Sequence, residues 1–217
     1  MKVFPVTVGH TSAGEPQRMG AAFWTERGMD VLGSRVRAEN LHLGCGVDRQ
    51  EFALGVDILP NVKPDVVCDC DVDGRRLHLP FRDNSFRCVF SHMFLEHIRD
   101  LMGLADECWR VLKPGGIFEA HIPWWSSHRT WGDPTHVRAF GPQSFVFWCH
   151  DKYRQAVVEG RPMTQMQRFA DFEIMHAILI LPKHLEGKGK EELDYMVEHL
   201  TNVVNSFWVR LRCIKEG

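Results

Sequence analysis

The chain has 217 residues, of which 44% are hydrophobic and 25% are charged, and its net charge is −2. This length and apolar content suffice for a single domain with a full core. The near-neutral balance of charges excludes a bulk field that would attract nucleic acid or acidic membranes, and no apolar run is long enough to cross a bilayer. We therefore expect no nucleic-acid partner and no membrane span.

The seven cysteines, an odd number, mostly lie within apolar runs, which favours reduced, packed thiols over a disulfide framework. Cys68 and Cys70 lack both the spacing and the second pair of a zinc site, so we expect no metal there. The first ten residues show no long apolar run after a basic start, so we expect no signal peptide. These features predict a cytoplasmic protein and leave a homo-oligomer open.

Residues 1–38 show no clean periodicity, and we expect an N-terminal cap of loops and one helix around Gln17–Arg35. Short apolar runs then alternate with helical segments, which is typical of a parallel sheet covered by helices. Strands are predicted at Leu41–Leu43, Phe52–Ile58, Asp65–Cys68, Cys88–Ser91 and Gly116–Ile122. A helix is predicted over Asp100–Leu112, because its apolar residues share one face, and Lys113–Gly116 ends it.

The C-terminal part is predicted as strand, helix and strand, at Phe172–Leu181, Glu191–Asn205 and Ser206–Ile214, with the last strand closing the sheet antiparallel. We expect one domain over residues 1–217, made of four consecutive parts. These are a cap (1–38), a cofactor-binding core (39–123), an acceptor-side loop and helix (124–171) and the C-terminal strand-helix-strand (172–217). In the third part, Pro142 opens a helix whose aromatic residues are interpreted as core.

A glycine turn, Gly44-Cys45-Gly46, follows the first predicted strand, and Asp57 ends the second strand after only ten intervening residues. Open α/β sheets bind ligands at such turns, because the backbone can come close to the ligand. An acid at the tip of the next strand can accept hydrogen bonds from both hydroxyls of a ribose. The pair predicts a cofactor that contains a nucleoside, although a lone GxG is also typical of an ordinary tight turn.

A dinucleotide is disfavoured, because its pyrophosphate needs a helix N-terminus opened by GxGxxG. The third glycine is absent here, and Asp48 and Glu51 would repel a pyrophosphate, whereas a sulfonium or an ammonium is compatible with them. A βαβ crossover with its helix needs at least about 10–12 residues, so the first helix is one turn or missing. A nicotinamide dehydrogenase therefore fits poorly.

Five segments resemble, in order and spacing, the class I S-adenosylmethionine-dependent methyltransferases: LHLGCG, GVDI, LPFRDNSF, HMFLEHI and RVLKPGGIFEAHIP. The resemblance covers residues 40–123 and extends through DPTHVRAF at 133–140, as in a branch with a shortened first helix that acts on sugars, lipids and natural products. It implies an α/β, Rossmann-like fold with a mostly parallel seven-stranded sheet, helices on both faces and a C-terminal antiparallel strand.

The resemblance also implies S-adenosylmethionine as the cofactor and seven cofactor-binding residues: Gly44, Cys45, Gly46, Asp57, Ile58, Asp69 and His92. The glycine turn would line the methionine and ribose portion. Asp57 would hold the ribose hydroxyls, and Ile58 would pack on the adenine. Asp69, with Asp71 as its rival, would accept from the adenine amino group, and His92 would meet the methionyl end.

Residues 121–140 concentrate three histidines, three tryptophans, two arginines and Asp133 in one connecting segment. Methyl transfer depends mainly on alignment, but a hydroxyl acceptor must also lose its proton to a base. We interpret this segment as the acceptor side, with His136 or His128 as the base and Asp133 orienting it. Asp133 could instead cap a turn, or bind a divalent metal together with His128 or His136. The Glu96-His97 pair is interpreted as structural.

The sequence therefore predicts a methyltransferase that acts on a small-molecule hydroxyl, first of all in a sugar-containing compound or a natural product. Two alternatives stay open: an N-methyltransferase, and a non-catalytic protein that binds S-adenosylmethionine. The many polar and aromatic side chains at 121–140 argue against a non-catalytic protein, because a scaffold does not need such a pocket.

Overall fold

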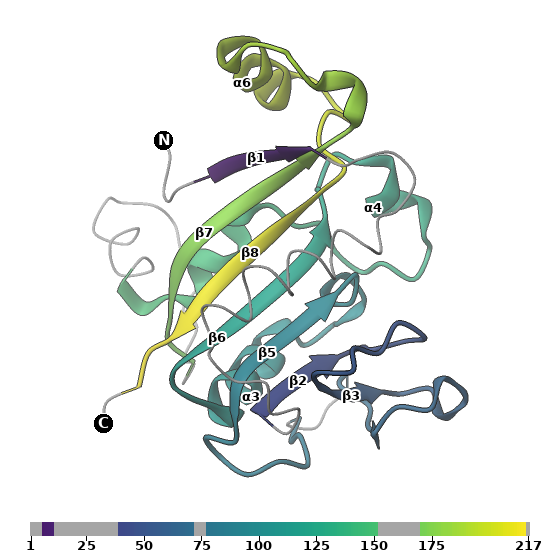
Figure 1. Cartoon of the computed structure of the whole chain (residues 1–217), viewed down its shortest axis with the longest axis vertical. Helices are drawn as coiled ribbons and strands as arrows, with labels where there is room; N and C mark the ends of the chain where they lie inside the picture. The colour runs from purple at the N-terminus through teal and green to yellow at the C-terminus, as the bar shows by residue number, and fades with distance from the viewer. Residues whose placement is uncertain (1–5, 11–38, 72–76, 152–169, 216–217) are drawn as a thin grey trace.

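The computed structural model describes residues 6–10, 39–71, 77–151 and 170–215 (Figure 1). They form one sheet of eight strands: β1 (Val6–His10), β2 (Asn40–Leu43), β3 (Leu54–Asp57), β4 (Val66–Val67), β5 (Phe86–His92), β6 (Leu112–Pro123), β7 (Phe172–Leu181) and β8 (Ser206–Cys213). The helices are α3 (Leu101–Val111), α4 (His128–Gly132) and α6 (Lys190–His199), with short 3₁₀ helices η3 (Pro60–Val62), η4 (Leu95–His97), η5 (Pro142–Trp148) and η6 (Lys183–Leu185).

The strands follow the order β1-β7-β8-β6-β5-β2-β3-β4 across the sheet. Strand β8 runs antiparallel to both β6 and β7, and the other neighbouring strands run parallel. The predicted fold class is thus confirmed in the seven strands β2–β8, with the C-terminal strand antiparallel. Strand β1 adds an eighth strand beside β7, so the expectation of loops is wrong at Val6–His10, whose β-branched residues favour a strand. The helix expected around Gln17–Arg35 lies outside the described residues.

Several predicted elements are shorter than expected, among them β4, which covers Val66–Val67 of the predicted Asp65–Cys68. Strand β3 begins at Leu54 rather than Phe52, because the preceding residues form a turn in which the Ala53 N–H donates to the Gln50 carbonyl (3.2 Å). Helix α6 ends at His199, well before Asn205. Leu200 ends the helix in an extended conformation, with φ of −118° and ψ of 153°. The chain then passes through Asn202, which has a φ of 58°, a left-handed conformation that asparagine tolerates better than most residues.

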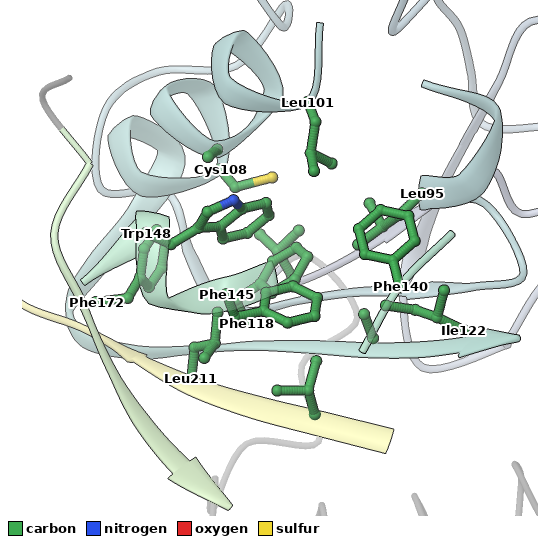
Figure 2. Packing of buried hydrophobic residues seen from close by; sticks show 14 of the residues in the cluster. Leu95, Leu101, Cys108, Phe118, Ile122, Phe140, Phe145, Trp148, Phe172 and Leu211 are labelled. Carbon is green, nitrogen blue, oxygen red and sulfur yellow. The ribbon is translucent and has the colours of Figure 1, made fainter. Parts of the chain in front are cut away.

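Helix α3 packs its apolar face on one side of the sheet, as its periodicity predicts. Its N-terminus is capped by Asp100, whose carboxylate accepts a hydrogen bond from the Gly103 N–H (2.9 Å). Figure 2 shows Phe145 and Trp148 of η5 lying between α3 and the sheet. Both side chains are completely buried, so the interpretation of these aromatic residues as core is confirmed.

The opposite face of the sheet carries buried polar side chains, because residues alternate between faces along a strand. In β6, Phe118 and Ala120 belong to the core beneath α3, whereas Glu119 points to the other side and accepts a 2.6 Å hydrogen bond from Nε of Arg210 in β8. On β2, His42 stacks on Phe90 with the ring centroids 4.3 Å apart.

Candidate functional site

The parallel strands β2, β3, β4 and β5 end at one edge of the sheet, and α4 lies at the same edge beside the end of β6 (Figure 1). Residues 44–53 between β2 and β3 contain no helix, so the expectation of a missing first helix is confirmed. The glycine turn therefore lies directly at the end of β2, within reach of the end of β3.

Both glycines of this turn have left-handed backbones, with φ of 61° at Gly44 and 50° at Gly46. A Cβ atom at Gly44 would lie 2.2 Å from Cδ2 of Phe94, so no side chain fits there without movement. A Cβ atom at Gly46 would meet no described atom within 4 Å. The turn is thus closed on the side of Gly44 and open beside Gly46, where a ligand can approach the backbone.

Cys45, between the two glycines, is buried and its N–H donates to the Val56 carbonyl (3.0 Å). Burial raises the pKa of its thiol to about 11, and the nearby carboxylate of Asp57 adds to this shift. The thiol is therefore protonated at neutral pH, so Cys45 can shape the turn but is a poor nucleophile.

The carboxylate of Asp57 is hydrogen-bonded to the turn. Oδ2 accepts from the N–H of Gly46 (2.8 Å), and Oδ1 accepts from the N–H of Leu59 (2.9 Å). A carboxylate has about four lone-pair sites, so each oxygen can still accept a hydrogen bond from a ligand. The half-buried carboxylate is thus oriented to meet two neighbouring hydroxyls, as the predicted ribose role requires.

Apolar side chains are exposed immediately beside this acid. Ile58 and Leu59, after β3, are 55% and 52% exposed, and Val67 at the end of β4 is 56% exposed. An exposed apolar surface next to a hydroxyl-binding acid is suited to a flat, largely apolar ring that is attached to a ribose. This matches the predicted position of Ile58 against an adenine.

Asp69 and Asp71, the two acids predicted as alternatives for an adenine amino group, have different environments. Asp71 is engaged, because its Oδ1 accepts from the backbone N–H of Arg99 (2.7 Å) and of Asp100 (3.2 Å) at the start of α3. Asp69 is exposed, and its Oδ1 accepts from the N–H of Asp71 (2.8 Å). The geometry therefore favours Asp69 as the acid that is available to a ligand.

His92, at the end of β5, lies between the glycine turn and a buried aromatic stack. Its ring centroid is 4.8 Å from that of His121, which in turn stacks on Trp208. Burial lowers the pKa of His92, and the carboxylate of Asp48 in the loop after the turn opposes part of that shift. A neutral imidazole thus lies near the predicted methionyl end of the cofactor.

On the acceptor side, the three predicted catalytic residues separate into two groups. His128 is exposed at the start of α4, and its backbone N–H donates to Oδ1 of Asn202 (2.6 Å). Asp133 and His136 are together, with 3.8 Å between Oδ2 of the acid and Nε2 of the ring. Hydrogen bonds from the side chain and backbone of Thr135 lower the pKa of Asp133, which is therefore ionised at neutral pH.

A further residue of this group, Glu96, was not among the predicted site residues. Its side chain is 1% exposed, and Oε1 lies 3.9 Å from Nε2 of His136. Neither carboxylate oxygen accepts a hydrogen bond from the described residues, and burial raises the pKa of the group to about 7. Buried polar groups are usually hydrogen-bonded, so this carboxylate is a candidate for ligand contact, and the structural interpretation of the Glu96-His97 pair stays a prediction. One signal was available: a charged residue inside an apolar run, MFLEHI, at the end of a strand.

The remaining residues of the acceptor segment have mixed surroundings. Trp124 is buried, whereas Trp125 and Trp131 are 48% and 67% exposed. Arg138 donates through Nη2 to the carbonyl of Arg99 and so braces the turn that precedes α3. The two exposed indole rings are available to an acceptor, and Arg138 has a structural partner.

The strand order is that of the class I methyltransferase fold. The open glycine turn, the acid bonded to it and the exposed apolar side chains lie at the strand ends where such sheets bind ligands. Comparison with known proteins agrees: residues 41–120 match the model of a family described as a methyltransferase domain. Residues 41–120 are thus similar to a methyltransferase domain, and the chain has the fold of the S-adenosylmethionine-dependent methyltransferases.

Two curated relatives match parts of the chain. A sterol 24-C-methyltransferase of Schizosaccharomyces pombe is 45% identical over 47 residues, which are 22% of this chain and 12% of that protein. A protein of Mycolicibacterium smegmatis, named as a probable S-adenosylmethionine-dependent methyltransferase, is 26% identical over 121 residues. These are 56% of this chain and 40% of that protein, so the chain spans less than half the length of either relative.

Solved structures agree on the fold. A S-adenosylmethionine-dependent methyltransferase of Archaeoglobus fulgidus superposes with a TM-score of 0.55 at 15% identity, over 90% of this chain and 94% of that one. The YcgJ protein of Bacillus subtilis superposes with a TM-score of 0.52 at 16% identity, over 87% and 97%. In the described part of the chain, no helix has the length and apolar character needed to cross a membrane.

Proposed function

We propose that the protein transfers a methyl group from S-adenosylmethionine to a small-molecule acceptor, with a hydroxyl as the preferred target. The observation that carries this proposal is the pairing of Asp57 with the N–H of Gly46 beside open space. That arrangement provides two acceptor oxygens for a ribose and an approach to the backbone, without a helix N-terminus for a pyrophosphate.

The cofactor, when bound, supplies a methyl group that is activated by its sulfonium. In the proposed complex, the ribose hydroxyls donate to Asp57, the adenine lies against Ile58 and its amino group donates to Asp69. Gly44, Cys45 and Gly46 line the ribose and methionine portion, and His92 lies at the methionyl end. The acids in the loop after the turn favour a cation over an anion at this end of the site.

The acceptor is proposed to lie beside α4, where Trp125 and Trp131 offer exposed aromatic faces for a sugar ring or another flat compound. A hydroxyl acceptor must lose a proton, and the group formed by Glu96, Asp133 and His136 is the proposed place for that step. His128 is not part of this group. Among the three candidates predicted from the sequence, the geometry therefore favours His136 with Asp133.

The test is turnover of labelled S-adenosylmethionine against matched panels of sugar, phenol and amine acceptors. We expect label in hydroxyl products. Label confined to amines would support the N-methyltransferase alternative, and binding of the cofactor without turnover of any acceptor would support a non-catalytic role. The sterol relatives share too short a segment to predict the acceptor, so a sterol belongs in the panel as an independent compound.

A further inference from the structure

Three side chains from two separate segments meet at the edge of the sheet where β5 ends. Glu96 and His97 belong to η4, and His136 follows α4. One nitrogen from each imidazole and one carboxylate oxygen all lie within 4.8 Å of one another. Within the described residues, no other three histidine, cysteine or acidic side chains bring their ligand atoms this close together.

The carboxylate of Glu96 needs a partner that the described residues do not supply. A buried carboxylate without hydrogen bonds is costly, because it loses its hydration without compensation. A proton would remove the charge but leave the carboxyl O–H without an acceptor there, since Nε2 of His136 is 3.9 Å away and too far for a hydrogen bond. A cation between the two groups would satisfy both of them.

The hydrogen bonds around the two imidazoles leave a lone pair on each ring. Nδ1 of His136 lies 2.7 Å from the Thr130 carbonyl, which can only accept, so this nitrogen carries the proton. The hydroxyl of Thr135 donates to Asp133 (2.7 Å), so its 3.0 Å contact with Nδ1 of His97 has the imidazole as the donor. Each Nε2 is therefore unprotonated when the ring is neutral. Metal-binding histidines are held by the same kind of outer hydrogen bond.

We propose that Glu96, His97 and His136 bind a divalent transition-metal ion of the zinc class. Two imidazole nitrogens and one carboxylate suit zinc, iron(II) or cobalt(II), whereas magnesium and calcium prefer sets of oxygen ligands. Three protein ligands leave at least one coordination position for an exogenous oxygen. Asp133, whose Oδ2 is 3.8 Å from Nε2 of His136, lies at the rim and adds negative charge.

The spacing of the three ligand atoms is wider than in a loaded site. Ligands at 2.0–2.1 Å from a tetrahedral ion lie about 3.3 Å apart, against an upper limit of 4.8 Å here. A small inward movement of the side chains would close the set around the ion. The proposal rests on these residues alone and not on methyl transfer. If an acceptor hydroxyl binds there, the ion lowers the pKa of that hydroxyl, and His136 then serves as a ligand.

The experiment uses the full chain after removal of metal with a chelator. Calorimetric titration with Zn²⁺ should give one site per chain, and Co²⁺ should give the visible absorption of a four- or five-coordinate ion. Glu96→Gln and His136→Gln should weaken Zn²⁺ binding at least about 100-fold, and Thr135→Val, which removes an outer hydrogen bond, about 10–100-fold. Glu186→Gln and His184→Gln, which change exposed residues of the same types, should bind as the unmodified chain does.

Circular dichroism of each variant shows whether it is folded, and His97→Gln replaces any ligand variant that is not. Absence of Zn²⁺ and Co²⁺ binding to the folded, unmodified chain would overturn the proposal. Binding that is undiminished in Glu96→Gln and His136→Gln, or that is lost equally in His184→Gln, would do the same. Calorimetry with S-adenosylhomocysteine on the metal-free chain tests the cofactor site separately, so failure of one proposal is distinguishable from failure of the other.

Discussion

The N–H of Gly46 and Oδ2 of Asp57 form a 2.8 Å hydrogen bond that joins the end of β2 to the end of β3. The bond fixes an acid beside a left-handed glycine turn before any ligand arrives. Such preorganisation reduces the ordering that a ligand must impose on binding. The bond also holds the turn in place without a helix, as the proposed nucleoside site requires.

The two glycines of the turn should respond differently to alanine. Gly44→Ala combines a left-handed backbone, which costs roughly 1–2 kcal/mol, with a contact against Phe94 that costs about 1–3 kcal/mol more. Gly46→Ala has the backbone cost alone, since no described atom would touch its Cβ, but the methyl group would enter the open space. Urea unfolding should therefore show the larger loss of stability for Gly44→Ala.

Gly44→Ala and Gly46→Ala should also differ in how they affect ligand binding relative to stability. We expect Gly46→Ala to weaken S-adenosylhomocysteine binding by more than its modest loss of stability suggests. Gly132→Ala is the matched control, because it also meets no described atom within 4 Å and lies in α4 without a left-handed backbone. Equal losses of stability in the two turn variants would contradict the close contact between Gly44 and Phe94.

Acid should destabilise the fold through His42. Burial lowers the pKa of this ring from 6.5 to about 3, with the charge of His92 acting in the same direction and that of Asp57 opposing it. The unfolded chain takes up the proton below about pH 6.5 and the folded chain does not, so stability is lost as the pH falls between these two values. The loss attributable to this residue approaches about 1.4 kcal/mol per pH unit.

His42→Phe removes this titration and keeps a ring against Phe90. The free energy of unfolding of this variant should therefore decline less steeply than that of the unmodified chain between pH 6 and pH 4. Urea titrations at several pH values give both slopes. Parallel slopes would show that His42 is protonated in the folded protein.

His136 and His128 should differ in their effects on turnover. His136→Ala should leave S-adenosylhomocysteine binding intact and lower turnover of a hydroxyl acceptor about 10²- to 10⁴-fold. The loss is expected whether His136 accepts the proton itself or holds the ion that lowers the pKa of the hydroxyl. His128→Ala should have little effect, because that side chain is exposed and outside the group around Glu96. A large loss in His128→Ala with full turnover in His136→Ala would reverse the assignment.

Local patterns were sufficient to predict much of this fold. The apolar face of α3 and the short connection after Gly46 depend on residues close in sequence, and the structure agrees with both predictions. The early end of α6 depends on the extended backbone of Leu200, which periodicity does not detect. Strand β1 exists because a distant strand, β7, pairs with it, and no local pattern reports that pairing.

The cofactor side of the candidate site could be predicted from the sequence better than the acceptor side. The turn and Asp57 follow from the spacing of glycines and an acid along two adjacent strands. Glu96 could not be placed in the same way, because its burial and its approach to His136 depend on the packing of α4 and the following loop against η4, about forty residues away in the chain. The burial of Glu96 therefore depends on contacts between distant segments, which no local sequence pattern reports.

The central claim is that the edge of the sheet at Gly46 and Asp57 binds an adenosyl compound. Calorimetry with S-adenosylhomocysteine tests it most directly, with Asp57→Ala for comparison. We predict one site per chain, an affinity that falls by about 1–3 kcal/mol in the variant, and no binding of NAD. Binding of NAD without S-adenosylhomocysteine, or an equal affinity for S-adenosylhomocysteine in Asp57→Ala, would contradict the claim.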